Sequence, residues 1–329
     1  MRHFITMKAV VFKKYGQPEK VLEIGEVEKP IPKENEVLIQ VQATAVNDYD
    51  WSLVRGKPFL YRLMFGLLKP KHQISGMELS GVIEGVGSKV EKFKIGDAVY
   101  GDISNYGFGT FAEYLCIDEK AVIRKPDELS FEVATAIPHA SLLALQAMRD
   151  IGKIEEGQKI LINGAGGGVG TIGVHLAKLY GCAVTGVDTG EKLDMMKSIG
   201  FDHTIDYKKE NFTKNGERYD LILDCKTDKP AFSYLRSLKP NGKYVTVGGN
   251  LSRLIKLLFW SRIVSVFSTK KLHIVSLRPN EGLDYVDKLF RQNKIKCVID
   301  GPYSMKDIPR LIQYFGEGKH KGKIVIKMN

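Results

Sequence analysis

The stretch Asn163-Gly-Ala-Gly-Gly-Gly-Val-Gly170 decides the fold, because it lies between a β-like segment, Lys159 to Asn163, and a helix-like segment that ends near Tyr180. Ala165, Gly167 and Gly170 match the three small-residue positions of a dinucleotide-binding turn, with Gly166, Gly168 and Val169 between them. A turn without bulky side chains lets backbone amides and the positive helix end approach a pyrophosphate. Ordinary tight turns can carry the same short motif, but the apolar flanks favour phosphate binding. We therefore predict that residues 165–170 bind a dinucleotide cofactor.

The end of the next predicted strand, Ala183 to Val187, carries two opposing signals about this cofactor. Asp188, eighteen residues after Gly170, can accept hydrogen bonds from the ribose hydroxyls of NAD and would repel a 2′-phosphate. Lys192, with the hydroxyls of Thr189 and Tyr207, can instead hold the 2′-phosphate of NADP. The alternative for Lys192 is an ordinary solvated helix lysine. The pattern slightly favours NADP(H) over NAD(H).

The spacing of apolar residues along the sequence divides the chain into two parts. Residues 7–125 contain short β-like segments separated by Gly and Pro, which is typical of a β-rich, barrel-like domain. A helix is predicted from Ser130, as its cap, to Gly152, and from Lys159 strands and helices alternate as in a doubly wound parallel sheet. The tail, with a last predicted strand at 323–326, resembles the first part. We therefore expect an α/β protein with one domain at 1–126 and 277–329 and a second at 127–276.

Composition excludes several classes of protein. The 329 residues are 43% hydrophobic and 26% charged, which excludes wholesale disorder, collagen and coiled coil. The net charge of +11 favours anionic partners, but no nucleic-acid motif accompanies it, so nucleic acid is not expected as a partner. Four widely spaced cysteines and an N-terminus without a signal-peptide core predict a cytoplasmic protein. No stretch is long and apolar enough to predict a membrane-spanning helix.

Several spaced motifs resemble the medium-chain dehydrogenase/reductase superfamily, in the zinc-independent branch of quinone oxidoreductases. The resemblance covers nearly the whole chain from Met7 and rests on motifs in the family's order: Met7-Lys-Ala-Val-Val-Phe, Glu36-Val-Leu-Ile, Ala45 to Trp51, Gly76 to Gly81, Gly96 to Gly101, Phe111 to Tyr114, Asn163 to Gly170, Ile205-Asp-Tyr207 and Gly322-Lys-Ile-Val325. It implies a GroES-like catalytic domain at 1–126 and 277–329, a Rossmann domain at 127–276 and a homodimer formed through the Rossmann domains. Gly248 and Lys323 complete the residues expected near the cofactor.

The same resemblance predicts that zinc is absent. Zinc-dependent relatives place a Cys ligand where this chain has Asn47 and a His ligand where it has Met77. Pro138 to Ser141 offers no Cys, and His139 alone is more typical of a helix-face or capping residue than of a ligand. Without a Lewis acid to stabilise an alkoxide, a quinone or enone is the easier hydride acceptor, because the incoming charge is delocalised.

The resemblance also suggests the catalytic residues. Tyr49 falls where relatives place a hydroxyl that contacts substrate, so it is a candidate proton or hydrogen-bond donor, although it equally fits a partly buried barrel tyrosine. Asn47 replaces the metal ligand and can bind a carbonyl oxygen through its amide, or satisfy backbone groups in its turn. Asp50 and Glu78 match residues that orient ligands in metal-dependent relatives, and here a structural role is favoured.

Two segments are both basic and apolar. Residues 55–71 fit either a wall of a pocket for a bulky apolar substrate or a packed helical insertion. Residues 251–267 place apolar side chains at helical spacing, interrupted by Arg253, Lys256 and Arg262. Such a stripe packs on the sheet or on a partner subunit more often than it contacts a membrane peripherally.

The leading hypothesis is a zinc-independent, NAD(P)H-dependent oxidoreductase that transfers hydride to a small-molecule quinone, enone or related carbonyl. Two alternatives stay open: a metal-free NAD(P)-dependent alcohol dehydrogenase, and a nucleotide-binding regulatory or membrane-associated protein with little turnover.

Overall fold

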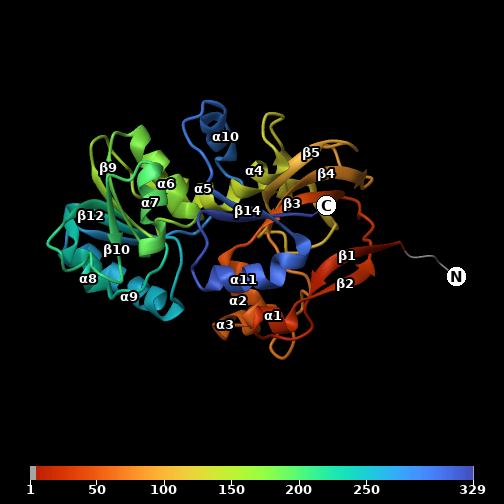
Figure 1. The fold of residues 1–329 in the computed structure, drawn as a ribbon, viewed down its shortest axis with the longest axis horizontal. Helices are drawn as coiled ribbons and strands as arrows, with labels where there is room; N and C mark the ends of the chain where they lie inside the picture. Colours follow the sequence, from red (N-terminus) through yellow and green to blue (C-terminus); the bar gives the residue numbers. More distant parts are fainter. Residues whose placement is uncertain (1–4, 329) are drawn as a thin grey trace. The chain divides into compact units, whose positions relative to one another are not determined.

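The computed structural model describes residues 5–328 and divides into two compact units, both of which can be followed along the chain in Figure 1. The first unit runs to His139 and includes Pro279–Glu281 and the segment that begins at Ile299. The second unit consists of Ala140–Arg278 and Gly282–Val298. No helix within residues 5–328 is long and apolar enough to cross a membrane.

The first unit is built around a largely antiparallel sheet. Its order is β14-β15-β3-β4-β5-β7, with β6 pairing β3, and β1 pairs with β2 in a separate ribbon. The strands are β1 (Thr6–Val11), β2 (Glu23–Glu28), β3 (Glu36–Ala45), β4 (Glu78–Val86), β5 (Ala98–Asp102), β6 (Tyr114–Asp118), β7 (Ile123–Arg124), β14 (Ile299–Ser304) and β15 (Lys323–Lys327). β3 pairs with β15, β4 and β6, and its alternate side chains Val37, Ile39 and Val41 are fully buried in the core.

Short helices complete the first unit. They are α1 (Pro18–Val21), α2 (Asp48–Arg55), α3 (Leu60–Phe65), α4 (Phe131–Ala136) and α11 (Ile308–Gly316). α11, from the end of the chain, packs against α1 and α2 from its beginning, as Figure 1 shows. Leu53 and Val54 of α2 and Leu311 and Ile312 of α11 are buried in the same core. The N-terminal end of α2 is thereby held in a fixed position, which matters for the residues around Asn47.

The second unit contains a six-stranded sheet in which every pairing is parallel. The strands are β8 (Lys159–Asn163), β9 (Ala183–Asp188), β10 (His203–Asp206), β11 (Tyr219–Asp224), β12 (Leu238–Thr246) and β13 (Lys271–Ile274), in the order β10-β9-β8-β11-β12-β13. Numbered within the unit, this is the strand order of the dinucleotide-binding Rossmann fold. Ile160, Leu161 and Ile162 are all fully buried because both faces of the sheet are covered.

Six α-helices lie wholly or mostly within the described residues of the second unit. They are α5 (Pro138–Leu145), α6 (Gly168–Leu179), α7 (Leu193–Ser198), α8 (Ala231–Arg236), α9 (Leu251–Phe267) and α10 (Leu283–Arg291). Figure 1 shows α6 and α7 on one side of the sheet and α8 and α9 on the other. The predicted α/β class, with a GroES-like and a Rossmann-like unit, is confirmed.

The helix predicted from Ser130 to Gly152 is not continuous. Ser130 does cap α4, since its Oγ accepts a hydrogen bond from the amide of Val133. A separate helix, α5, begins at Pro138, and Gln146–Ile151 forms a π-helical turn. The division follows from Pro138, which has no amide hydrogen to continue the helix before it.

The boundaries of the two units differ from the predicted domain boundaries at residues 127–139, 277–278 and 282–298. The chain passes from one unit to the other after His139 and not after residue 126, because α4 packs against β3 and β4 of the first unit. Residues 282–298, expected with the catalytic domain, belong to the second unit. There Arg149 lies over the ring of Tyr285, 5.2 Å from its centroid, and the amide of Lys296 donates a 3.5 Å hydrogen bond to Nδ1 of His175.

Candidate functional site

The glycine turn joins β8 to α6 in the second unit. A Cβ added at Gly170 would lie 2.5 Å from both Cα and the carbonyl oxygen of Ala165, so only glycine lets the helix start this close to the strand. Gly167 is the N-cap of α6, and no side chain caps the first amides of the helix, which belong to Gly168, Val169 and Gly170. Uncapped amides at a helix start beside a bare turn fit the pyrophosphate of a dinucleotide.

Asp188, at the end of β9, is bound to the glycine turn. Its Oδ2 accepts a 2.9 Å hydrogen bond from the amide of Gly166, and its Oδ1 accepts one from the amide of Thr189. Lys192 Nζ lies 3.3 Å from Oδ1, and the Lys192 side chain is only 3% exposed. Lys192 is therefore not a solvated helix lysine but part of a buried ion pair next to the turn.

The remaining predicted cofactor residues of the second unit lie at the same edge of the sheet. Tyr207 follows β10, is about half exposed, and its amide donates a 3.1 Å hydrogen bond to the carbonyl oxygen of Asp188. Gly248 follows β12, and its carbonyl oxygen accepts hydrogen bonds from the hydroxyls of Thr227 and Thr246. Since Asp188 and the glycine turn also follow strands, the structure brings these residues to the carboxyl ends of the parallel strands, where such folds bind ligands.

Asp224, at the end of β11, is a residue of this edge that the sequence analysis missed. Its Oδ1 accepts a 2.9 Å hydrogen bond from Nδ2 of Asn163, and its Oδ2 accepts one from the hydroxyl of Tyr244. Burial raises the pKa of Asp224, against the lowering effect of hydrogen bonds from the Lys226 amide, the Thr227 amide and the tyrosine hydroxyls. The contact joins β8 to β11, the two strands at which the order of the sheet reverses. A polar residue directly after the apolar strand Leu221–Leu223 was the available signal.

Asn47 and Asp50 organise the start of α2 in the first unit. The amide of Asn47 donates a 2.8 Å hydrogen bond to Oδ2 of Asp50, while Oδ1 of Asp50 accepts from the Ser75 hydroxyl at 2.6 Å and the Gly76 amide at 2.8 Å. Burial raises the pKa of Asp50 to about 6, although these hydrogen bonds lower it. Asp50 thus ties the helix start to the loop before β4.

A buried polar cluster, formed by Asn47, Glu78 and Lys323, lies beside this helix start. Nδ2 of Asn47 donates a 2.9 Å hydrogen bond to Oε2 of Glu78, and the Lys323 ammonium contacts the same Glu78 oxygen at 2.5 Å and donates to Oδ1 of Asn47. The other Glu78 oxygen accepts a 2.6 Å hydrogen bond from the amide of His139. Lys323 was predicted near the cofactor, and the structure shows it on β15 as the positive charge of this cluster.

His139 and Asp102 form a second buried pair in the same unit. Nδ1 of His139 lies 2.8 Å from Oδ2 of Asp102, whose Oδ1 accepts a 2.9 Å hydrogen bond from the amide of Ser104. Burial lowers the pKa of His139, but the hydrogen bond and charge of Asp102 outweigh it, so the pKa is raised above 6.5. Burial raises the pKa of Asp102 while His139 lowers it, and the balance is a lowered value. The sequence favours a helix-face or capping role for His139, and it does not indicate the pairing with Asp102.

Tyr49 faces an aromatic cluster. Its ring centroid lies 6.0 Å from that of Tyr61 and 6.1 Å from that of Phe108, and Phe65 and His72 extend the cluster. Burial raises the pKa of Tyr49, and the negative charges of Asp48 and Asp102 raise it further. The hydroxyl therefore keeps its proton at neutral pH. Residues 55–71 contain the short helix α3, which has no buried residue, and they supply Tyr61 and Phe65 to this cluster. A role of the segment as a wall of a substrate pocket stays a prediction.

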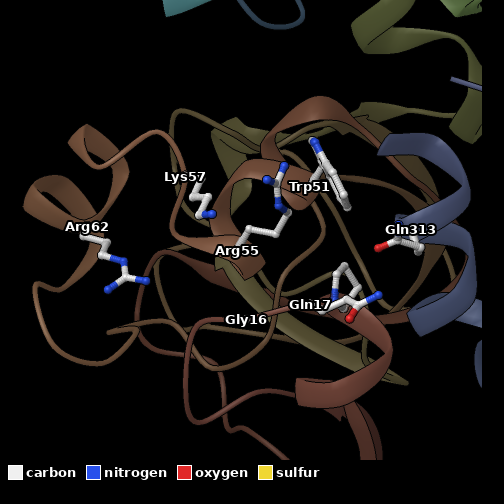
Figure 2. Close-up of a pocket in the computed structure, with 8 residues that line it drawn as sticks. Gly16, Gln17, Trp51, Arg55, Lys57, Arg62 and Gln313 are labelled. Atoms are coloured by element: carbon white, nitrogen blue, oxygen red, sulfur yellow. The ribbon is translucent and has the colours of Figure 1, made fainter. Parts of the chain in front are cut away.

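A separate pocket of about 350 Å³ lies on the other side of α2 (Figure 2). Trp51 and Arg55 of α2 and Gln313 of α11 line it, with Lys57 and Arg62, and the Arg55 guanidinium lies 4.0 Å above the ring of Trp51. Tyr49 and Trp51 are two residues apart on α2 and so project about 200° apart around the helix axis. None of the predicted site residues lines this pocket.

A structural or catalytic zinc site needs three or four nitrogen, sulfur or carboxylate ligands gathered at one place. Within residues 5–328, no group of three or more His, Cys, Asp or Glu side chains is placed to hold a metal ion. At the position expected for a cysteine ligand, the amide of Asn47 is hydrogen-bonded to Glu78, and the neighbouring positive charge is the Lys323 ammonium. The donor groups present do not fit zinc.

Comparisons with known proteins agree with this architecture. Residues 33–127 match the family model of the alcohol dehydrogenase GroES-like domain, and residues 199–326 match that of a zinc-binding dehydrogenase. The chain is similar to the chloroplast envelope quinone oxidoreductase homolog of Arabidopsis thaliana, with 30% identity over 98% of both chains. It is also similar to the NADPH-dependent alkenal/one oxidoreductase of the same plant, with 28% identity over 97% of this chain and 79% of the relative.

Solved structures point the same way. The quinone oxidoreductase from Coxiella burnetii superposes with a TM-score of 0.87 and 26% identity, covering 99% of this chain and all of that one. The whole-chain match at 30% identity extends beyond a shared fold. Together with the two matched family models, it shows that the chain belongs to the quinone oxidoreductase-like branch of the medium-chain dehydrogenase/reductase superfamily.

Proposed function

We propose that this NAD(P)-dependent oxidoreductase reduces a quinone, an enone or a related conjugated carbonyl without zinc. The observation that supports the proposal is the buried Asn47–Glu78–Lys323 cluster. Asn47, which the resemblance aligns with a cysteine ligand of zinc-dependent relatives, is hydrogen-bonded there to Glu78 and to the Lys323 ammonium. Reduction of a simple carbonyl develops alkoxide charge that a metal stabilises. A conjugated acceptor spreads that charge, so ordinary hydrogen-bond donors suffice.

The second unit supplies the cofactor site in this proposal. A bound nicotinamide dinucleotide supplies the hydride. The amides of Gly168, Val169 and Gly170 would hold its pyrophosphate at the start of α6. A Cβ added at Gly166 would lie 2.5 Å from Cδ of Lys192, so glycine at this position lets the turn pack against the Asp188–Lys192 pair. Gly248 and Tyr207 flank the same edge of the sheet. Small residues at Ala165 and Gly170 chiefly allow the helix to pack closely against the turn.

Preference for NADPH is part of the proposal. Both carboxylate oxygens of Asp188 already accept hydrogen bonds from the amides of Gly166 and Thr189, and Lys192 partly neutralises their charge. Asp188 therefore has less capacity to bind ribose hydroxyls or to repel a phosphate than a free carboxylate has. The NADPH-dependent alkenal/one oxidoreductase among the relatives supports the same preference.

Tyr49 is the proposed proton donor for the reduced substrate. Its raised pKa keeps the hydroxyl protonated, and the rings of Tyr61 and Phe108 form an apolar surface around it. Asn47 has a different proposed role from the one first considered, because Nδ2 and Oδ1 of its amide are engaged by Glu78 and Lys323. We propose that it positions the start of α2, and with it Tyr49, and does not bind the carbonyl itself.

Assembly as a homodimer is also proposed. Within residues 5–328, β13 pairs on one side only, with β12, and so ends the parallel sheet of the second unit. A second copy could continue the sheet from this edge, since edge strands present unpaired amide and carbonyl groups. A cytoplasmic location stays a prediction.

A turnover screen tests the central proposal. Purified protein is assayed with NADH and NADPH against quinones, enones, aldehydes and alcohols, and the metal content of the same sample is measured. We expect oxidation of NADPH with quinones or enones in samples without stoichiometric zinc. Turnover of alcohols alone would favour the alternative of a metal-free alcohol dehydrogenase, and activity that requires zinc would contradict the proposed chemistry.

Replacing Lys192 tests the choice of cofactor. Lys192→Ala should weaken NADPH binding by roughly 10- to 100-fold, the value of a charge-assisted contact to phosphate, and NADH binding far less. Isothermal titration calorimetry with both cofactors measures this. Lys209→Ala, at an exposed lysine beyond Tyr207, is the matched control. Equal losses for the two cofactors would remove the 2′-phosphate role of Lys192.

Tyr49→Phe tests the proton donor. Removing the hydroxyl but keeping the ring should lower kcat by about 100-fold or more while leaving NADPH affinity unchanged. Tyr61→Phe is the control, because its ring packs against Tyr49 at 6.0 Å and its hydroxyl interacts with Ser52. A kcat for Tyr49→Phe equal to that of the control would assign Tyr49 a packing role only.

Asp102→Asn tests the buried histidine pair. Without the carboxylate, burial becomes the dominant influence, so the pKa of His139 should fall below 6.5, as measured by NMR titration of its ring. A raised histidine pKa stabilises the fold below the unfolded value of 6.5, and this contribution is lost as the pH rises through the folded value. The variant should therefore lose more unfolding free energy at about pH 5 than at about pH 8.

The control is Asp48→Asn, because Oδ1 of Asp48 lies 3.8 Å from Nε2 of His139 and its side chain is 56% exposed. An unchanged His139 titration in Asp102→Asn would show that the hydrogen bond does not set the protonation of the ring.

A further inference from the structure

Helix α9 lies outside the proposed site and is held to the second unit by one face. Leu257 and Val264, seven residues apart and thus on the same face, are buried in the core around the parallel sheet. Oδ1 of Asn250 accepts a hydrogen bond from the amide of Arg253 and caps the first turn. Trp260 packs edge-on against Phe232 of α8, with ring centroids 4.6 Å apart. The helix is therefore a fixed part of the fold.

The opposite face of α9 is an exposed apolar stripe. Ile255, Leu258, Phe259 and Val266 follow the i, i+3, i+4, i+11 spacing of one helix face, and their exposed fractions are 59%, 57%, 62% and 74%. Phe267, at the end of the helix, is 85% exposed. Single exposed apolar residues are ordinary, but a contiguous patch of this kind marks an interaction surface.

Two positively charged side chains lie in or beside the stripe. Arg262 lies within the stripe, seven residues after Ile255, and Lys256 lies at its side. Arg253, Lys256 and Arg262 form no ion pair within residues 5–328. Residues 229–280 contain ten Lys or Arg and no Asp or Glu, against a net charge of +11 for the whole chain. Most of the excess positive charge thus comes from the part of the sequence that contains α9.

We propose that α9 docks on an anionic phospholipid surface. The helix lies in the plane of the interface, with Ile255, Phe259 and Val266 in the acyl boundary and Lys256 and Arg262 reaching back to the headgroup phosphates. A second copy of the chain is a poorer partner for this face. Two α9 helices packed through this face would bring together four cations, Lys256 and Arg262 of each copy, without an acidic residue of α9, whereas lipid phosphates complement them.

Flotation with vesicles tests this docking surface. The full chain is mixed with vesicles of phosphatidylcholine alone or of phosphatidylcholine with phosphatidylserine, and bound protein is measured. We expect binding to the anionic vesicles, little to the neutral ones, and weakening at high salt. Lys256→Glu with Arg262→Glu should reduce the affinity at least about tenfold, and Phe259→Ser should reduce it through the apolar contact.

The matched control reverses the same amount of charge elsewhere. Lys208→Glu with Lys209→Glu changes two exposed lysines after β10 and should leave vesicle binding within about twofold. Binding of NADPH and the mass in solution are measured for every variant. The proposal is overturned if the wild-type chain does not bind anionic vesicles, if the two charge reversals reduce binding equally, or if Phe259→Ser changes the oligomeric state and not lipid binding.

Discussion

The close approach of α6 to the end of β8 is the constraint on which the rest of the second unit depends. At Gly170 the helix backbone comes so near to Ala165 that a Cβ would lie 2.5 Å from its backbone atoms. This leaves the first amides of α6 uncapped at the point where the strand order reverses between β8 and β11. Asp188 then fixes the turn from the neighbouring strand through the amide of Gly166. The packing of α6 against the glycine turn is thus sufficient to create a nucleotide site, without any residue that is specific for one ligand.

In the first unit, the buried carboxylate of Glu78 is the constraint that organises the surrounding elements. Glu78 is fully buried, and its two oxygens are satisfied by Asn47, Lys323 and the amide of His139. Leaving a buried carboxylate without such partners would cost several kcal/mol. The cluster therefore holds the start of α2, the start of β15 and the backbone at His139 in fixed relation within this unit. Tyr49 is the second residue of α2, so this buried cluster also fixes the position of the proposed proton donor.

The motifs predicted the fold closely where local patterns determine it. The apolar strand before Asn163, the glycine turn and the helix to Leu179 have the predicted order, and the segment 251–267 is the helix α9. The break at Pro138 and the placement of residues 282–298 were not predicted, because each depends on packing between segments distant in the sequence. The same limit applies to side-chain pairs. His139 with Asp102, and Asn163 with Asp224, join residues 37 and 61 positions apart, and no spacing rule connects them.

The route of the chain between the two units has a consequence for engineering. It crosses after residues 139, 278, 281 and 298, so neither unit is one continuous segment. The brief return at 279–281 is anchored, since Asn280 Nδ2 donates hydrogen bonds to the carbonyl oxygens of Asp102 and Ala121. A chimera that exchanges the nucleotide unit as residues 140–298 would replace this anchor as well. Such a graft must retain Asn280. Otherwise the first unit loses the hydrogen bonds that Asn280 makes to the carbonyl oxygens of Asp102 and Ala121.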